Sequence, residues 1–192
     1  MSLSNDILAT IDRFSAELDR LGVAWAIGGS IASSIHAEPR STNDVDFVAS
    51  LRPVHAAALA RALGPGFYVD EATALDAIVE HRSFNLIDQQ SMVKIDVFVP
   101  PPGPLGDGQL ERRVRVEIDE DFHCYVLSRE DTALQKLRWY QLGDCSSERQ
   151  WGDILGLLGD PERLDLAYLR RVATSGGLDD LLERALADAT LR

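Results

Sequence analysis

The chain has 192 residues, of which 45% are hydrophobic and 26% are charged, ordinary values for a globular protein that exclude a disordered or fibrous one. Its 31 acidic residues outnumber 19 lysines and arginines and give a formal net charge of −12. This charge repels phosphate backbones and disfavours tight nonspecific binding to nucleic acids.

The amino-acid pattern predicts a cytoplasmic protein without membrane segments. Asp6, Asp12 and Arg13 interrupt the apolar residues near the start, where no basic segment is found, so a signal peptide is not expected. No apolar stretch reaches the length of about 18 residues that a transmembrane helix needs. Cys124 and Cys145 form no C-x-x-C motif, and we expect both to be reduced.

The first two thirds of the chain predict a mixed α/β region. Apolar residues at helical spacing alternate with short runs typical of strands. In chain order we expect helices over 4–21, 31–37, 53–63 and 71–79, strands over 23–27, 44–49 and weakly over 67–69, and two hairpins with strands over 83–87 and 92–99 and over 114–118 and 122–127.

From Ser128 onward only helical spacing is found, over 128–142, 147–158, 165–174 and 178–188. We therefore expect an α/β core over 1–127 followed by a helical region over 128–192. The loop 100–108 holds four of the eight prolines, and we expect it to join two strands at the surface or to border a substrate cleft.

Two aspartates on a predicted apolar strand are the first candidates for chemistry. Side chains alternate across a strand, so Asp44 and Asp46 leave one face while Val45 and Phe47 enter the core. A D-x-D pattern can arise by accident in so acidic a chain, as we infer for a solvated turn at 119–121. A charge stranded on an apolar strand is costly unless a metal, hydrogen bonds or a cleft compensates it, which favours a site here.

A third carboxylate, Asp96, lies in the apolar strand over 92–99, on the same face as Lys94 and Phe98. If this strand pairs beside the first, three carboxylates converge. Oxygen ligands without cysteine or paired histidine suit Mg²⁺ or Mn²⁺, which bind a few carboxylates together with substrate phosphates. The pattern therefore predicts a metal-dependent site for a phosphate-bearing ligand, in which a pair of metal ions could stabilise a displacement at phosphorus.

Gly28, Gly29 and Ser30 separate a predicted strand from a helix. Glycines allow close approach of a ligand, and helix N-terminal amides together with the Ser30 hydroxyl can donate to phosphate oxygens. A plain tight turn is the alternative. Neither a P-loop motif nor a dinucleotide-binding G-x-G-x-x-G motif is present, which excludes the two common phosphate-loop readings.

The combination of Gly28-Gly29-Ser30, Asp44-Val45-Asp46 and Asp96 resembles the signature of the DNA polymerase β-like nucleotidyltransferase superfamily. The segment from Gly28 to Phe47 is similar to the bacterial branch that contains abortive-infection toxins and some aminoglycoside nucleotidyltransferases. In the helical region, the Ala-x-x-Lys-Leu pattern that ends in Lys136-Leu137, followed by Arg149 and Asp153, resembles a helical motif pair of the abortive-infection type.

The resemblance implies a polymerase β-like α/β (α+β) core with a mixed sheet, followed by a C-terminal helical bundle. It implies a Mg²⁺-dependent enzyme that transfers a nucleoside monophosphate from an NTP to a hydroxyl group and releases pyrophosphate. The expected metal ligands and catalytic residues are Asp44, Asp46 and Asp96, and the expected nucleotide-binding residues are Gly28, Gly29, Ser30, Arg40, Thr42, Lys136 and Asp153.

Individual roles follow from residue chemistry. Asp96 would assist deprotonation of the acceptor, and Lys136 could meet the triphosphate as a compact charge. Asp153 could hold Lys136 across the helix pair, or it could cap a helix or form a local salt bridge. Trp139 or Tyr140 could stack on the base or simply pack in the helical region.

The acceptor stays open at this point. The resemblance implies tRNA or a protein as the target of a toxin, paired with an antitoxin protein. A small hydroxylated molecule such as an aminoglycoside is the alternative, since the negative chain would attract a cationic drug. A non-catalytic binding module or regulator with the same fold is the third possibility.

Overall fold

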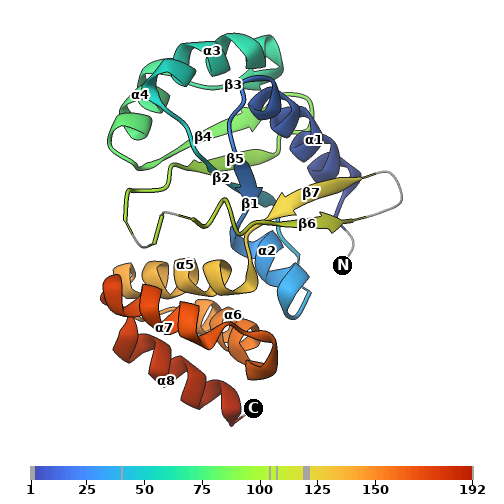
Figure 1. The fold of residues 1–192 in the computed structure, drawn as a ribbon. Helices are drawn as coiled ribbons and strands as arrows, with labels where there is room; N and C mark the ends of the chain where they lie inside the picture. Colours follow the sequence, from blue (N-terminus) through green and yellow to red (C-terminus); the bar gives the residue numbers. More distant parts are fainter. Residues whose placement is uncertain (1–2, 40, 104, 107, 119–121, 192) are drawn as a thin grey trace.

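The computed structural model describes residues 3–39, 41–103, 105–106, 108–118 and 122–191. A mixed sheet is covered by helices on both faces, and the last four helices gather at one end of the molecule (Figure 1). This arrangement confirms the predicted α/β class with a following helical region. The acidic turn at 119–121 lies outside the described residues.

The helices and strands follow the order expected from the sequence. The strands are β1 (Trp25–Ile27), β2 (Asp44–Ala49), β3 (Phe67–Tyr68), β4 (Ser83–Asp88), β5 (Lys94–Phe98), β6 (Val114–Glu117) and β7 (His123–Val126). The α-helices are α1 (Asn5–Arg20), α2 (Gly29–His36), α3 (Pro53–Leu63), α4 (Glu71–Val79), α5 (Arg129–Leu142), α6 (Glu148–Leu158), α7 (Leu166–Ser175) and α8 (Asp179–Thr190).

The strands form one sheet in the order β3-β4-β5-β2-β1-β7-β6. β2 is parallel to β5 and β1 is parallel to β7, whereas the other neighbours are antiparallel. Both predicted hairpins are present as β4–β5 and β6–β7. The strand that carries Asp96 therefore lies directly beside the strand that carries Asp44 and Asp46.

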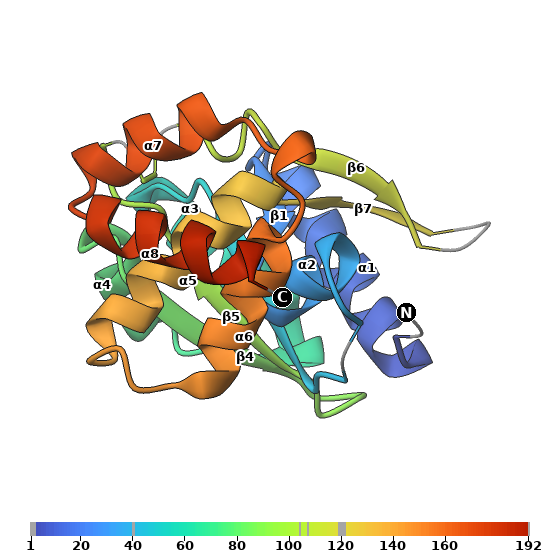
Figure 2. The same ribbon diagram turned by 90° about the horizontal axis from the view of Figure 1, so that it is seen from below.

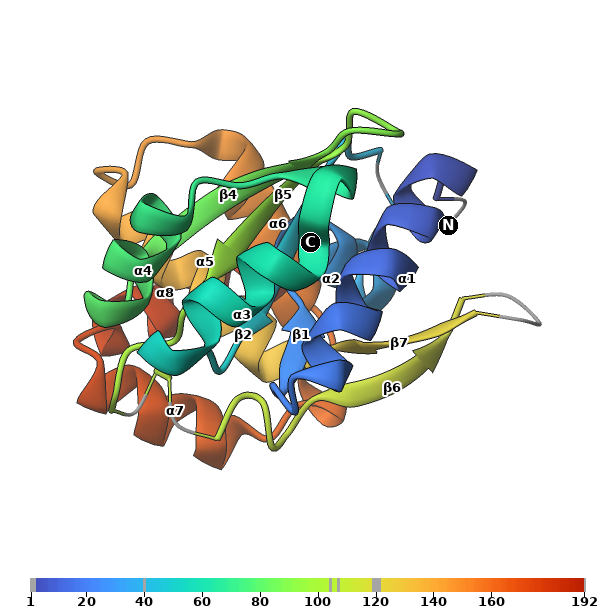
Figure 3. The same cartoon turned by 90° about the horizontal axis from the view of Figure 1, so that it is seen from above.

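One face of the sheet packs against α1, α3 and α4, which lie in front of the strands when the molecule is seen from above (Figure 3). Val45, Phe47 and Ile95 are fully buried, and the ring of Phe47 meets that of Phe14 on α1 edge to face, with centroids 4.8 Å apart. Because strand side chains alternate, the polar residues of β2 and β5 point to the opposite face.

That opposite face is covered by α2 and α5, with α6 to α8 beyond them (Figure 2). The helices α5 to α8 share their own hydrophobic cluster, in which Leu137, Leu157, Leu169 and Leu182 are buried. The boundary between residues 127 and 128 stays a prediction. In the described part of the chain, no helix is long and apolar enough to cross a membrane.

Candidate active site

The register of β2 and β5 brings the predicted acidic residues together. Asp46 lies directly opposite Asp96, and Asp44 lies directly opposite Lys94. All four side chains leave the sheet on the face covered by α2 and α5. Asp44 is exposed, whereas Asp46 and Asp96 are partly buried.

Lys94 completes this group with a positive charge. Its Nζ atom lies 2.9 Å from Oδ2 of Asp96, and 43% of its side chain is exposed. The sequence analysis placed Lys94 on this face but gave it no role, although its position two residues before Asp96 was the available signal. In this state the lysine supplies the cation that Asp96 contacts.

The carboxyl group of Asp46 is in an environment that disfavours its charge. Burial and the nearby Asp96 raise the pKa of Asp46, and the Ser30 backbone N–H, which donates to the carboxylate, and Lys136 lower it. The net effect is a raised pKa, so the surroundings leave the negative charge of Asp46 incompletely compensated.

Gly29 allows Asp46 to approach the start of α2. A Cβ atom built on Gly29 would lie 1.8 Å from Oδ2 of Asp46, and the residue has a φ of +54°, in the region that favours glycine. The N–H of Gly28 donates to the backbone carbonyl of Asp46 at 2.8 Å. Gly29 is therefore needed for contact between this helix terminus and the acidic strand, and α2 begins two residues earlier than expected.

The helices α5 and α6 bring basic groups to the other side of the acids. The Nζ atom of Lys136 on α5 donates to Oδ2 of Asp153 on α6 at 2.8 Å, with both side chains less than 15% exposed. The Ser128 hydroxyl caps the start of α5 by accepting from the Asp131 N–H at 3.0 Å. Asp131 in turn accepts from the Tyr168 hydroxyl on α7 at 2.6 Å, which fixes the position of α5.

These groups surround a cavity of about 390 Å³ between the sheet and α5. Its volume lies in the range of small-molecule sites. Six of the predicted site residues line it, namely Gly29, Ser30, Asp46, Asp96, Lys136 and Asp153. Its other lining residues are Ser83, Phe98, Thr132, Gln135, Trp139, Arg149 and Gln150.

The remaining predicted residues lie apart from this lining. Gly28 and Asp44 are next to it in sequence, and the Thr42 hydroxyl donates to the Asp44 carbonyl at 3.1 Å, where it shapes the loop before β2. Arg40 lies outside the described residues.

Of the two aromatic candidates on α5, only Trp139 reaches the cavity. It is 47% exposed and meets Phe98 edge to face, with centroids 5.6 Å apart. Tyr140 is buried and packs against Trp151 within the helical region. The sequence analysis missed Ser83 and Gln135, for which only strand alternation and helical spacing gave a signal.

The donor chemistry of the acidic group fits a hard divalent cation. Carboxylate oxygens are the ligands that Mg²⁺ and Mn²⁺ prefer, and the pKa of Asp46 is raised by burial and by the neighbouring Asp96. Within the described residues, however, no three His, Cys, Asp or Glu side chains are gathered into a ready metal cage. A cation bound here would compete with Lys94 for Asp96.

Comparison with known proteins agrees with this architecture at the level of the fold. No family model and no curated protein sequence matches the chain. An antigenic nucleotidyltransferase-like protein from Paracoccidioides brasiliensis aligns with a TM-score of 0.50 and 21% identity, covering 96% of this chain and 94% of its own.

Two further solved structures have the same fold. A Thermotoga maritima protein assigned to the nucleotidyltransferases aligns with a TM-score of 0.52 and 15% identity, covering 78% of this chain and 94% of its own. The lincosamide antibiotic adenylyltransferase LnuA, with lincomycin bound, aligns with a TM-score of 0.51 and 12% identity over 81% of this chain and 96% of its own. The chain therefore has the nucleotidyltransferase fold that its motifs predict.

Proposed function

We propose that the chain is a Mg²⁺-dependent nucleotidyltransferase that transfers a nucleoside monophosphate from an NTP to an acceptor hydroxyl group. The observation that carries this proposal is the pairing of Asp46 with Asp96 across β2 and β5, directly against the glycine-led start of α2. A helix terminus provides donors for phosphate oxygens, and the facing carboxylates provide ligands for the cation that accompanies a nucleotide.

Asp44, Asp46 and Asp96 would hold the metal ion, with Mn²⁺ as the alternative to Mg²⁺. The bound ion would neutralise the carboxylates and the triphosphate and would stabilise the charge that develops at phosphorus. Asp44 lies at the exposed start of β2, two residues before Asp46 and on the same face of the strand. Lys94, whose Nζ atom contacts Asp96, would give up this contact to a bound ion.

The basic and amide groups would hold the triphosphate. Gly29 would provide a backbone N–H and Ser30 a hydroxyl at the start of α2, and Lys136 would provide a compact charge on the opposite wall of the cavity. Gly28 would position this turn through the bond from its N–H to the Asp46 carbonyl. Asp153 holds the Lys136 ammonium in place through its bond of 2.8 Å. These groups would stabilise the negative charge of the departing pyrophosphate.

Residues around the edge complete the nucleotide site. Arg149 lines the same cavity and adds a second positive charge. We assign Arg40 and Thr42 to nucleotide binding, with Thr42 acting through the shape of the loop before β2. The exposed ring of Trp139 offers a face on which a base can stack.

Asp96 is the group that would accept the proton of the acceptor hydroxyl. It lies on the strand next to Asp46 and lines the cavity. General base catalysis of this kind contributes about 10²–10⁴-fold to a rate.

The proposal is tested by label transfer. The protein is incubated with Mg²⁺ and NTPs radiolabelled at the α-phosphate, together with tRNA, a protein extract or a small-molecule extract, and both label and pyrophosphate are measured. We expect Mg²⁺-dependent transfer that falls about 100-fold or more in Asp96→Asn. Equal transfer by wild type and Asp96→Asn would contradict the proposal.

The molecule that receives the label distinguishes the remaining functional hypotheses. Label on tRNA or protein supports the toxin assignment, with an antitoxin as its partner, and label on a small molecule supports a modifying enzyme. Binding of Mg-NTP without pyrophosphate release for any acceptor, together with a co-purifying partner protein, identifies a non-catalytic binding module.

A further inference from the structure

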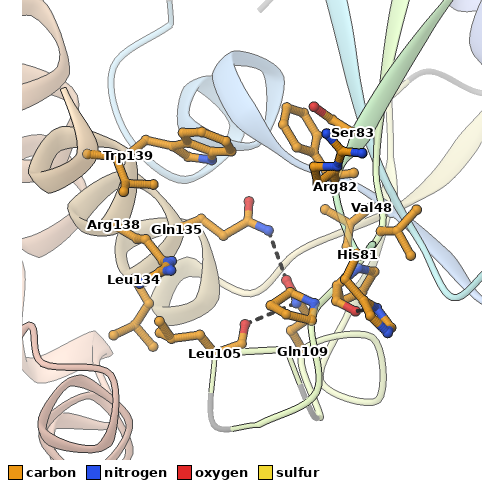
Figure 4. A pocket seen from close by; sticks show the side chains of 15 residues that line it. Val48, His81, Arg82, Ser83, Leu105, Gln109, Leu134, Gln135, Arg138 and Trp139 are labelled. Atoms are coloured by element: carbon orange, nitrogen blue, oxygen red, sulfur yellow. Dashed lines mark hydrogen bonds between the residues drawn. The ribbon is translucent and has the colours of Figure 1, made fainter. Parts of the chain in front are cut away.

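A second cavity of about 480 Å³ lies beside the candidate active site (Figure 4). It is bounded by α5 on one side, by the ends of β4 and β5 on the other, and by the proline-rich loop after β5. Ser83, Phe98, Gln135 and Trp139 line both cavities, so the two are adjacent. The volume is typical of pockets that bind small organic molecules.

The second cavity begins next to the proposed general base. Asp96 and Phe98 are alternate residues of β5 and point to the same face, about 7 Å apart along the strand. Ser83 of β4 lies directly opposite Phe98 in the sheet. A molecule in this cavity therefore lies beside Asp96, which itself lines the first cavity.

The wall of the cavity is apolar. Phe98, Leu105, Leu134 and Trp139 contribute to it, and Leu142 lies at its edge with 58% of its surface exposed. An apolar body placed against these residues would be removed from water, which is favourable at roughly 25 cal/mol per Å².

The charges around the cavity are positive, in contrast to the rest of the chain. None of the described residues that line it is acidic, and two are arginines, although the formal net charge of the chain is −12. The Arg82 guanidinium is held by Asp76 at 2.5 Å. Arg138 is exposed on α5 and makes no ion pair with any residue of the described part of the chain. It is available to pair with an anionic group on a ligand.

Hydrogen bonds fix the remaining side of the cavity. The Gln135 amide donates to the Gln109 side-chain oxygen at 2.9 Å, and the Gln109 amide donates to the Leu105 carbonyl at 3.1 Å (Figure 4). These bonds connect α5 to the loop 100–108, one of whose two predicted roles was to border a substrate cleft. Pro100, Pro101 and Leu105 of this segment line the cavity.

We infer that this cavity takes the acceptor, a small hydroxylated molecule with an apolar body and an anionic group that pairs with Arg138. The inference rests on the proposed transferase function. In the reaction, the acceptor oxygen forms a bond to the α-phosphorus and the bond from that phosphorus to pyrophosphate breaks. The hydroxyl proton passes to the Asp96 carboxylate, and pyrophosphate leaves on the side of Lys136.

This chemistry disfavours polycationic acceptors such as aminoglycosides inside the cavity, although the net charge of the chain would attract them from a distance. Arg138 would repel their amino groups, and the wall contains no described acidic residue to bind them. The end of an RNA strand also combines an aromatic base with anionic phosphates, so it has the same two features as the proposed acceptor. The net charge of −12 opposes the approach of a long polyanion, so we assign the cavity to a small molecule.

Two related dyes test the cavity directly. Anilinonaphthalene sulfonate carries an anionic group on an apolar body, and N-phenylnaphthylamine has the same body without the charge. We expect both to bind saturably to the full chain. In Arg138→Gln, sulfonate affinity should fall about fivefold while affinity for the neutral dye changes less than about twofold. In Leu142→Glu, which adds a negative charge at an exposed position, the sulfonate should also bind more weakly.

The matched control is Arg61→Gln, which removes an exposed arginine from α3 on the other face of the sheet. It should leave both dissociation constants unchanged. Absence of saturable binding, or equal sulfonate affinity in Arg138→Gln and Arg61→Gln, would overturn the inference. Circular dichroism confirms that each variant is folded.

Competition for the bound neutral dye identifies the ligand class. The anionic para-(hydroxymethyl)benzoate should displace it at lower concentration than the cationic para-(hydroxymethyl)benzylamine. Displacement by kanamycin or by tRNA at lower concentrations than the benzoate would overturn the assignment to a small anionic acceptor.

The same samples are titrated with a non-hydrolysable Mg-NTP. Failure of nucleotide binding with intact dye binding overturns the proposed transferase, and the reverse result overturns the acceptor cavity alone.

Discussion

At the scale of single residues, the candidate site depends on a contact that only glycine permits. Gly29 has a φ of +54°, and an added Cβ atom would overlap the Asp46 carboxylate at 1.8 Å. The carboxylate can neither stay beside the start of α2 nor accept from the Ser30 N–H if this space is filled. The contact between the start of α2 and β2 therefore requires a residue without a side chain at position 29.

We expect Gly29→Ala to weaken Mg-NTP binding by more than about tenfold and to destabilise the protein by about 1–3 kcal/mol, because alanine is strained at positive φ and displaces Asp46. Titration calorimetry and urea unfolding measure the two effects. The control is Gly156→Ala in α6, where an added Cβ would be 3.4 Å from the Ala37 Cβ, an ordinary contact. Similar effects for the two variants would show that the contact between Gly29 and Asp46 has no special role.

The raised pKa of Asp46 predicts that the charge needed for the proposed metal binding lowers the stability of the folded protein. The folded-state pKa of this carboxyl group is raised by burial and by Asp96, so its charge opposes folding once the pH exceeds that pKa. As the pH falls through the folded pKa, the group becomes neutral and the penalty disappears. We therefore expect Asp46→Asn to be more stable than wild type near neutral pH, by on the order of 1 kcal/mol or about 2–4 °C in Tm.

Thermal unfolding in the presence of EDTA measures this difference. It should be largest near neutral pH and should shrink towards about pH 4, where the wild-type carboxyl is also protonated. Asp12→Asn, which changes an exposed acid on α1, serves as the control. An Asp46→Asn variant that is less stable than wild type at neutral pH would contradict the raised pKa.

At the scale of elements, the pair α5 and α6 presents a cation to the acidic strands. Lys136 and Asp153 have side chains only 11% and 14% exposed, whereas the surface pair of Arg170 and Glu183 is 55% and 52% exposed at a similar separation of 2.7 Å. Water screens the second pair and not the first.

A double-mutant cycle on these two pairs tests the difference. We expect the coupling between Lys136→Ala and Asp153→Ala to be about 1–3 kcal/mol in the free energy of unfolding, and that between Arg170→Ala and Glu183→Ala to be below about 1 kcal/mol. Equal coupling energies for the two pairs would mean that the Lys136–Asp153 bond does not hold α5 and α6 in place.

The sequence predicts the elements of this fold closely, for local reasons. The alternation of polar and apolar residues over Asp44–Ala49 predicts the bounds of β2, and Pro53 predicts the start of α3. Both elements have the expected bounds in the structure. The register of β2 against β5 could not be predicted, because it depends on how Phe47 and Ile95 pack in a core built from distant segments. The positions of Asp46 and Asp96 were therefore predicted only conditionally.

Parts of the candidate site that depend on tertiary packing had no sequence signal. Ser83 and Gln135 enter the cavity because β4 pairs with β5 and because α5 lies across the sheet. Lys94 was visible as a neighbour of Asp96 on the same face, but its ion pair depends on side-chain geometry. The second cavity combines a loop, a hairpin end and a helix, which no local pattern connects.

At the scale of the whole molecule, the candidate site lies where the sheet and the helical region meet. Gly29, Asp46 and Asp96 come from the sheet side, and Lys136 and Asp153 come from α5 and α6. Each side has its own hydrophobic cluster. A nucleotide bound between them would therefore add contacts that the two clusters do not provide to each other.

We expect Mg-NTP to raise the stability of the whole chain. At a ligand concentration about 100 times its Kd, the gain is about 2.7 kcal/mol, which corresponds to a Tm increase of roughly 5–10 °C for a chain of this size. Differential scanning calorimetry with and without EDTA measures it. An increase that persists in EDTA would show that nucleotide binding needs no divalent ion.

The central claim is that Asp46 and Asp96, paired across β2 and β5 beside Gly29, hold the metal ion of a bound NTP. Isothermal titration with α,β-methylene NTPs, with and without Mg²⁺, tests it most directly. We predict Mg²⁺-dependent binding to wild type and loss of that binding in Asp46→Asn and in Asp96→Asn. Undiminished binding to both variants, or binding to wild type that is the same without Mg²⁺, would contradict the claim.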